Sequence, residues 1–226
     1  MKKAFYSEIA YFTGLIVLAI GTTLMEKADL GLSMVVAPAY ILHLKISEFL
    51  PFFTFGMAGY TFQALLLILT CMVLRKFKIS YLFSFITAVI YGCILDCVMF
   101  LLSPIEANNI AARIILFTVG MILGAAGIAF MFRTYISPEV YELIVKEVSD
   151  NFGFSIPKTK TTYDVSSCLL AIVLSFLFFG FGHFEGVKAG TVVCALLNGT
   201  LIGLLGKTYD KLWDFKDGLK IKKYFS

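Results

Sequence analysis

Polar and charged side chains lie inside or directly beside the long apolar runs of this chain, and these are the residues that could carry chemistry. Within a bilayer such groups are costly, so each one is by default a candidate for binding or transport. The candidate substrate-binding residues are Asn198, Tyr91, Gln63, Thr22, Thr23, Glu26, Lys27, Asp29, Arg133 and Asp96.

Some of these residues lie well inside apolar runs. Asn198 is about 10 residues into the last run, which places it roughly 15 Å deep at 1.5 Å per residue. Tyr91 and Gln63 lie at similar depths, and Thr22 and Thr23 lie one turn before the end of the first run. Two interpretations are open: these groups line a small polar cavity, or they form hydrogen bonds that hold neighbouring helices together.

Other candidates gather where two apolar runs break. Glu26, Lys27 and Asp29 follow the first run, and Arg133 follows the fourth. A short helix that starts at such a break has free N–H groups, which favour an anionic ligand if they face a cavity. The alternative is that the short helix lies on the surface and the charges solvate a turn. Asp96 is similarly open between a proton or cation site and a solvated helix end.

No catalytic or metal-binding motif accompanies these residues. The sequence has no phosphate-binding glycine loop, no HExxH, no G-x-S-x-G and only two histidines. We therefore expect no enzymatic activity, no metal and no cofactor. The enzymatic alternative is lipid chemistry by a carboxylate–histidine pair that the fold would assemble from Glu26 or Asp29 with His43.

The composition places these groups in a membrane protein. The chain is 59% hydrophobic and 15% charged, with a mean hydropathy of +0.89, whereas soluble domains are about 45–50% apolar. The net charge of +4 comes from residues between the apolar runs, so it does not indicate nucleic-acid binding. The five cysteines lie in apolar runs, which is atypical of a disulfide framework.

Six apolar runs approach the length of about 20 residues that a spanning helix needs. They are residues 8–25, 52–74, 80–102, 110–132, 162–182 and 187–206. We therefore predict an all-α fold, a polytopic bundle of six transmembrane helices that forms a single membrane domain over residues 1–226. Asp164, near the start of the fifth run, is expected to cap that helix.

Two shorter segments are predicted to be extra helices, each following the first span of one half of the chain. Residues 33–46 carry Pro38 and are too short to span comfortably. Residues 137–151 are amphipathic and are predicted to lie in the membrane interface, with Ser137 as N-cap and Pro138 at the first helical position. Whether either short helix enters the membrane is open.

Basic residues indicate the orientation. With six spans and the N-terminus inside, only Lys27, Lys45, Arg113 and Lys188 of the 19 basic residues fall outside. This bias follows the positive-inside rule and predicts that both termini are cytoplasmic. The tail, residues 207–226, alternates charges with apolar residues and is predicted to be an amphipathic helix on the inner lipid surface. A partner-binding tail is the alternative.

The sequence also contains an internal repeat. The matching residues are Gly14, Ile16, Ala19, Gly21 and Met25 in the first half and, about 106 positions later, Gly120, Ile122, Ala125, Gly127 and Met131. The predicted repeats cover about residues 8–104 and 110–206. Because each repeat has three spans, the second is inverted relative to the first. Transporters often use inverted repeats, with the site near the midplane between them.

Three sequence elements resemble the YczE/YyaS/YitT family of bacterial membrane proteins. They are G-x6-G-x3-M-x-K-A-D-L-G from Gly14 to Gly31, Y-G-C-I-L-D ending at Asp96, and A-G-T-V-V-C-A-L-L-N-G-T-L-I-G from Ala189 to Gly203. The resemblance covers nearly the whole chain and implies a bacterial cytoplasmic-membrane protein. Family members have no settled biochemical function and are often suspected of small-molecule transport or export. Many carry a Gly-rich acidic turn after the fourth span, which this chain replaces with R-T-Y-I-S-P.

The leading hypothesis is therefore a small-molecule transporter or exporter of unknown substrate, with a cavity between the repeats. It predicts that Asn198, Tyr91 and Gln63 converge and that the short helices point into the cavity. The alternative is a non-transporting accessory or scaffold protein that acts through the tail and the 137–160 segment. We expect contact with the lipid bilayer and none with nucleic acid, and a homodimer is plausible because six short spans form a thin bundle.

Overall fold

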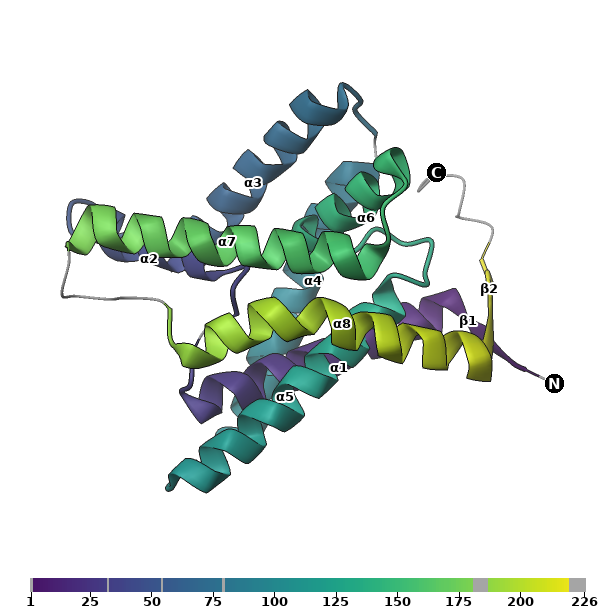
Figure 1. Ribbon diagram of the computed structural model, residues 1–226, viewed down its shortest axis with the longest axis horizontal. Helices are drawn as coiled ribbons and strands as arrows, with labels where there is room; N and C mark the ends of the chain where they lie inside the picture. The colour runs from purple at the N-terminus through teal and green to yellow at the C-terminus, as the bar shows by residue number, and fades with distance from the viewer. Residues whose placement is uncertain (1, 32, 54, 79, 181–186, 220–226) are drawn as a thin grey trace.

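The computed structural model describes residues 2–31, 33–53, 55–78, 80–180 and 187–219 (Figure 1). This part of the chain forms a bundle of eight helices with one pair of short strands. In chain order the elements are β1 (Lys3–Tyr6), α1 (Ser7–Ala28), α2 (Ala37–Ser47), α3 (Phe55–Leu74), α4 (Ser80–Leu101), α5 (Ile110–Met131), α6 (Val140–Phe152), α7 (Ile156–Phe179), α8 (Ala189–Leu212) and β2 (Trp213–Lys216). The predicted all-α fold is confirmed.

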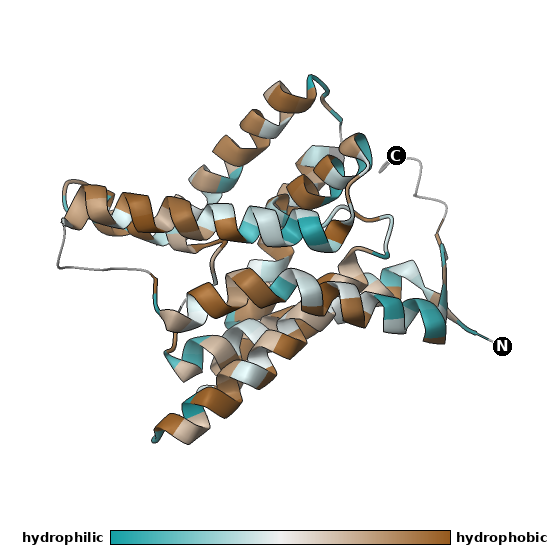
Figure 2. Ribbon diagram, in the orientation of Figure 1, coloured by the Kyte–Doolittle hydropathy of each residue, from teal (hydrophilic) through white to brown (hydrophobic). Residues whose placement is uncertain are grey.

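Six of the described helices are long and apolar enough to cross a membrane: α1, α3, α4, α5, α7 and α8. They coincide with the six predicted spans. Met72 of α3, Ile86 of α4 and Leu177 of α7 are among many large apolar side chains left exposed on their outer faces. Hydrophobic residues cover most of these helices in Figure 2, and hydrophilic ones gather in the N-terminal half of α7. The protein is therefore an integral, multi-pass membrane protein.

Local sequence explains where two of the spans begin and end. α1 ends at Ala28 because Asp29 adopts the left-handed conformation, with φ 51°, as the C-cap. α7 begins earlier than predicted because Pro157 occupies its first turn, where a missing N–H is tolerated. Asp164 consequently lies two turns inside α7 and is fully buried, so the prediction that it caps this helix is wrong.

The most extensive helix contact is the antiparallel packing of α1 against α5. Glycines set its distance: a Cβ on Gly14 would lie 2.9 Å from the carbonyl oxygen of Gly127, and a Cβ on Gly120 would lie 2.7 Å from that of Gly21. Any side chain at these positions would force the backbones apart, as in other small-residue interfaces between membrane helices. This contact joins the first helix of one predicted repeat to the first helix of the other.

The short helix α6 is buried inside the bundle, so the prediction of an interfacial helix over residues 137–151 is wrong. It packs against α3, α4 and α7, and its N-cap is Glu139 rather than Ser137. The sequence misleads here because the charges of α6 suggest solvation, whereas Glu142 and Glu147 are paired with lysines from other segments. The other short helix, α2, packs against α3 and α7, with Pro38 in its first turn.

The two chain ends lie together. Residues 3–6 of β1 pair in parallel with residues 213–216 of β2, and Phe5 stacks on Trp213 with ring centroids 5.3 Å apart. Glu8 then accepts hydrogen bonds from the backbone N–H groups of Gly218 and Leu219. Residues 207–212 are helical as predicted, since they continue α8. The helix predicted over 207–226 is wrong for residues 213–219, where β2 pairs with β1 and the backbone that follows binds the Glu8 carboxylate. Residues 220–226 lie outside the described part.

Candidate functional site

A cavity of about 260 Å³ lies at the centre of the bundle, among α1, α4, α5, α6, α7, α8 and the segment before α2. Both breaks contribute to its wall: Ser33 and Met34 come from the segment after α1, and Glu139 and Glu142 come from the start of α6. The volume lies just below the range of about 300–1,000 Å³ that is typical of drug-sized ligands. The cavity can therefore hold a small molecule.

A buried ion cluster closes one side of the cavity. The ammonium of Lys160, a residue only 1% exposed, lies 3.1 Å from Glu142 Oε1 and 3.0 Å from Asp164 Oδ1. Asn198 Nδ2 donates to Asp164 Oδ2 over 3.4 Å. The cluster thus joins α6, α7 and α8. One lysine shared by two carboxylates leaves a negative charge that is only partly balanced.

Glu139 lies beside this cluster and differs from its members. Its side chain is 7% exposed and lines the cavity. Although Glu139 is the N-cap of α6, it makes no capping hydrogen bond, and its Oε1 has no hydrogen-bond partner among the described residues. Burial and the neighbouring Glu142 carboxylate raise the pKa of Glu139 well above its ordinary value, and Lys160 opposes this shift. The group is therefore poised to hold a proton or a cation.

The predicted residues Thr22, Thr23, Glu26 and Tyr91 line the opposite side. The Thr22 and Tyr91 hydroxyls share a hydrogen bond of 2.8 Å between α1 and α4. Thr23 donates to the carbonyl of Ala19, one turn back in α1, over 2.9 Å. Glu26 is exposed at the end of α1. The structure thus brings Asn198, Tyr91 and both threonines to one cavity, although Thr22 and Tyr91 also bond two helices.

Gln63 does not line the cavity, although it lies near a residue that does. Its side chain is buried in α3 near Tyr141, which lines the cavity, but the Tyr141 hydroxyl and Gln63 Oε1 have no hydrogen-bond partner among the described residues. The Tyr141 hydroxyl lies in a dry, acidic environment: burial and the nearby Tyr163, Glu139 and Glu142 raise its pKa. Of the three residues predicted to converge, Asn198 and Tyr91 line the cavity and Gln63 does not.

Asp29 and Lys27 lie at one end of the bundle and do not line the cavity. The Asp29 carboxylate is 2.6 Å from Lys188 Nζ and 3.5 Å from Arg113 Nη1, and its hydrogen bond to Lys188 lowers its pKa. Lys27 Nζ donates to the carbonyl of Ser103 over 3.5 Å. These contacts tie together the ends of α1, α5 and α8.

The other predicted residues also lie elsewhere. Arg133, at the opposite end of α5, makes a two-pronged ion pair with Asp210 of α8, with both N–O distances 2.6 Å. Asp96 is exposed on α4. His43 makes no hydrogen bond or ion pair with Glu26 or Asp29 within the described residues, so the carboxylate–histidine pair is not assembled there.

Sequence reasoning missed Glu139, Glu142 and Lys160 as cavity residues. Each lies outside the predicted apolar spans, so the sequence suggested solvated positions. Their spacing carried a signal, because Glu139 and Glu142 are three residues apart, and Lys160 and Asp164 are four apart on one face of a helix that runs into apolar sequence. That spacing indicates which side chains share one face of a helix, but it does not indicate which other segments pack against that face.

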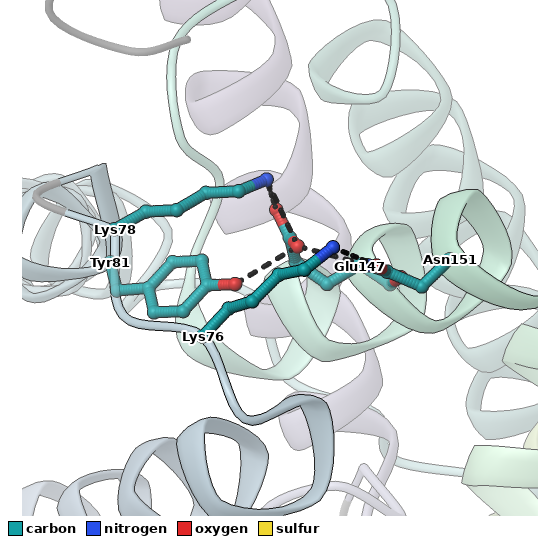
Figure 3. A network of polar contacts seen from close by, with 5 residues as sticks. All are labelled: Lys76, Lys78, Tyr81, Glu147 and Asn151. Atoms are coloured by element: carbon teal, nitrogen blue, oxygen red, sulfur yellow. Dashed lines mark hydrogen bonds and ion pairs between the residues drawn. The ribbon is translucent and has the colours of Figure 1, made fainter.

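A second buried glutamate on α6 makes a different set of contacts (Figure 3). Glu147 is 8% exposed, and its carboxylate accepts hydrogen bonds from Lys78 Nζ at 2.9 Å, Tyr81 Oη at 2.9 Å and Asn151 Nδ2 at 3.3 Å. It does not line the cavity. Its polar network joins the start of α4 to α6.

Comparisons with known proteins assign the chain to a family whose function is unknown. No curated protein and no solved structure matches the chain. Residues 5–207 match a family described as "Family of unknown function (DUF6198)". This match covers every residue that lines the cavity. The chain therefore belongs to this family of unknown function, DUF6198.

Proposed function

We propose that the protein is a small-molecule transporter or exporter of the bacterial cytoplasmic membrane, with its substrate site in the central cavity between two inverted repeats. The observation that carries this proposal is a cavity lined by both halves of the chain. It holds the buried carboxylate of Glu139, whose Oε1 has no hydrogen-bond partner among the described residues. Ionisable groups buried among membrane helices are costly and commonly mark a substrate or ion pathway. The resemblance to the YczE/YyaS/YitT family, whose members are suspected of transport, remains a prediction in agreement with it.

The glycine contacts between α1 and α5 support the inverted repeat. In the sequence repeat, Gly14 corresponds to Gly120 and Gly21 corresponds to Gly127. Gly14 packs against Gly127, and Gly120 packs against Gly21. Each repeat thus places its first glycine against the second glycine of the other repeat, which is the reciprocal relation expected of two units related by a two-fold axis.

The wider packing supports the same relation. α1 packs on α4 as α5 packs on α8, and α2 packs on α3 and α7 as α6 packs on α7 and α3. The relation fails at two places among the described residues (Figure 1). α7 packs extensively along α8, whereas α3 and α4 have no comparable contact, and α6 packs on α4, whereas α2 has no comparable contact with α8. Inverted-repeat transporters alternate access by moving one repeat or bundle against the other. A transporter caught in a single state, open to one side of the membrane, is expected to show an asymmetry of this kind between its repeats.

The described chain ends agree with an even number of spans, and the distribution of basic residues is what favours the cytoplasmic side for both termini. Parallel pairing of β1 with β2 places the ends on the same side of the bundle, as an even number of spans requires. The alternative accessory function would use the tail over 207–226 and the 137–160 segment. β2 of the tail and α6 of that segment pack within the chain itself, which favours transport over this alternative.

A thermal-shift ligand screen on the purified protein tests the proposed site. A ligand at 100 times its Kd should stabilise the fold by about 2.7 kcal/mol. The stabilisation should disappear in Gly124→Leu, because Gly124 lines the cavity and a Cβ there would meet only Leu18, at 3.9 Å. Asn198→Ala should weaken it. Gly59→Leu is the matched control, since a Cβ at Gly59 would meet nothing within 4 Å.

Two results decide the proposal. Uptake or release of a screened ligand by proteoliposomes, lost in Gly124→Leu and kept in Gly59→Leu, would support transport. A cooperative melt with no ligand in a broad screen, or ligands that bind Gly124→Leu as well as wild type, would contradict a small-molecule site in the cavity.

A further inference from the structure

The charges around the cavity do not balance. Lys160 is the one basic side chain in the described lining, and it is already shared by Glu142 and Asp164. Glu139 adds a third buried carboxylate, and Glu26 is exposed on the same lining. An anionic ligand would meet this excess of negative charge, whereas a cation would relieve it. The sequence suggested that an anionic ligand could bind at the start of the second short helix. In the structure the carboxylate of Glu139 already occupies that helix start, so we expect a cationic ligand instead.

Glu139 makes no direct ion pair among the described residues, and its nearest cation, Lys160, is paired with Glu142 and Asp164. Its carboxylate is more than nine-tenths buried, faces the cavity, and leaves Oε1 without a hydrogen bond among the described residues. The capping interaction with its own helix is available in principle but is not made. A single unsatisfied carboxylate in such a place fits a ligand with a single positive charge.

The rest of the lining selects the kind of cation. Met25, Met34, Met99 and Met121 contribute flexible, polarisable thioethers that adapt to apolar groups. The ring of Tyr141 adds an aromatic surface, and such rings attract organic ammonium ions. A hard inorganic cation such as Ca²⁺ would instead require six to eight oxygen ligands. The surroundings of Glu139 therefore favour a small organic ammonium ion.

We propose that the cavity binds a small, largely apolar organic monocation whose ammonium group pairs with the Glu139 carboxylate, and that binding displaces a proton from that carboxylate to the solution. This inference rests on the proposed transport function and names its substrate class. It makes Glu139 the shared site of substrate and proton, so that one can be exchanged for the other across the membrane.

The groups around Glu139 define the pH dependence. The titratable or charged groups that face it or line the same cavity are Tyr11 and Glu26 of α1, Tyr91 of α4, Tyr141 and Glu142 of α6, Lys160 and Asp164 of α7, and Cys194 of α8. Because burial raises the pKa of Glu139, a cation must compete with a proton there below that pKa. Affinity should then rise with pH, by up to about tenfold per pH unit, and level off above the pKa.

Calorimetric titration with benzyltrimethylammonium tests the inference, using the full chain in lipid nanodiscs and empty nanodiscs as the blank. Phenylacetate and 3-phenylpropanol serve as anionic and neutral probes of similar size. Glu139→Gln should weaken the binding of the cation at least about thirtyfold, since a buried charge then loses its partner. Glu147→Gln, an equally buried glutamate of α6 outside the cavity, should leave the binding unchanged. Titration in two buffers of different ionisation enthalpy should give proton release, which Glu139→Gln abolishes.

Each outcome decides the inference. Binding of the cation that depends on Glu139 and releases a proton supports it. Equal affinity in Glu139→Gln, or binding without proton release at every pH, overturns it. Preference for phenylacetate or 3-phenylpropanol overturns the cationic class but leaves the cavity as a substrate site. No binding by any probe also overturns the inference, and the ligand screen with Gly124→Leu then decides separately whether the proposed function survives.

Discussion

Glu139 and Glu147 are two glutamates of one short segment, eight positions apart and equally buried. They differ in the hydrogen-bond partners that the bundle provides for their carboxylates. Glu147 is surrounded by three donors, from Lys78, Tyr81 and Asn151. Glu139 faces a cavity and leaves one oxygen without a partner. Burial alone therefore does not separate a structural carboxylate from a functional one. The separation comes from whether neighbouring groups satisfy the charge, because a satisfied group stabilises the fold and an unsatisfied one costs stability.

The difference follows from where the partners come from. The donors to Glu147 come from the α3–α4 connection, the first turn of α4 and the next turn of α6, so they hold three nearby backbone segments together (Figure 3). The side chains that α1 and α4 contribute to the cavity around Glu139 are mostly apolar or bonded to one another. A protein that retains such a carboxylate gives up stability at that position, which is common at functional sites.

The largest expected effect comes from removing the lysine beside the cavity. Lys160→Met leaves Glu142 and Asp164 buried near each other without a counter-charge, so we expect a loss of about 3–5 kcal/mol in the free energy of unfolding. Lys78→Met is the matched control: Lys78 is 43% exposed, and Glu147 keeps Tyr81 and Asn151. That variant should lose less than about 1 kcal/mol. Equilibrium unfolding in micelles measures both, and equal losses would contradict the comparison.

A smaller effect separates the two glutamates directly. Glu147→Gln weakens a satisfied network, so we expect a loss of about 1–3 kcal/mol in unfolding free energy. Glu139→Gln removes an unsatisfied buried charge and should leave the stability unchanged or higher. Thermal melts of both variants beside wild type check this difference. If Glu139→Gln were destabilised as much as Glu147→Gln, then Glu139 would have a structural role.

The smallest effect appears in the pH dependence. Burial raises the pKa of Glu139 above its ordinary 4.5, so the folded protein holds this proton more tightly than the unfolded chain does. The contribution of Glu139 to stability therefore falls as pH rises from about 4.5 to its folded pKa, and is constant above it. The stability of Glu139→Gln relative to wild type should increase over this window, by at most about 1.4 kcal/mol per pH unit. A difference that is constant or falls with pH would contradict the assignment.

Some of the residues that line the cavity could be predicted from the local sequence, and others could not. Asn198, Tyr91 and Thr22 were predictable because polar residues within an apolar run must point towards protein or water, whatever the fold. Glu139, Glu142 and Lys160 were not predictable, because they lie outside the apolar runs in the sequence, where a charged side chain is expected to be solvated. Their burial depends on α6 turning back into the bundle, and this depends on contacts with α3, α4 and α7 that are distant in sequence.

The sequence by itself determined that the protein crosses the membrane in six helices. The length of an apolar run is a local property, and this length decides whether a helix can span the bilayer. It also predicted the two breaks, from the charged residues Glu26, Lys27 and Asp29 after the first run and from Arg133 and Pro138 after the fourth. Only the tertiary structure decided that α6 lies inside, that the tail forms a strand against residues 3–6, and that Glu147 finds partners while Glu139 does not. The physical reason is that the cost of a buried charge is set by its neighbours in space, and a linear pattern does not specify them.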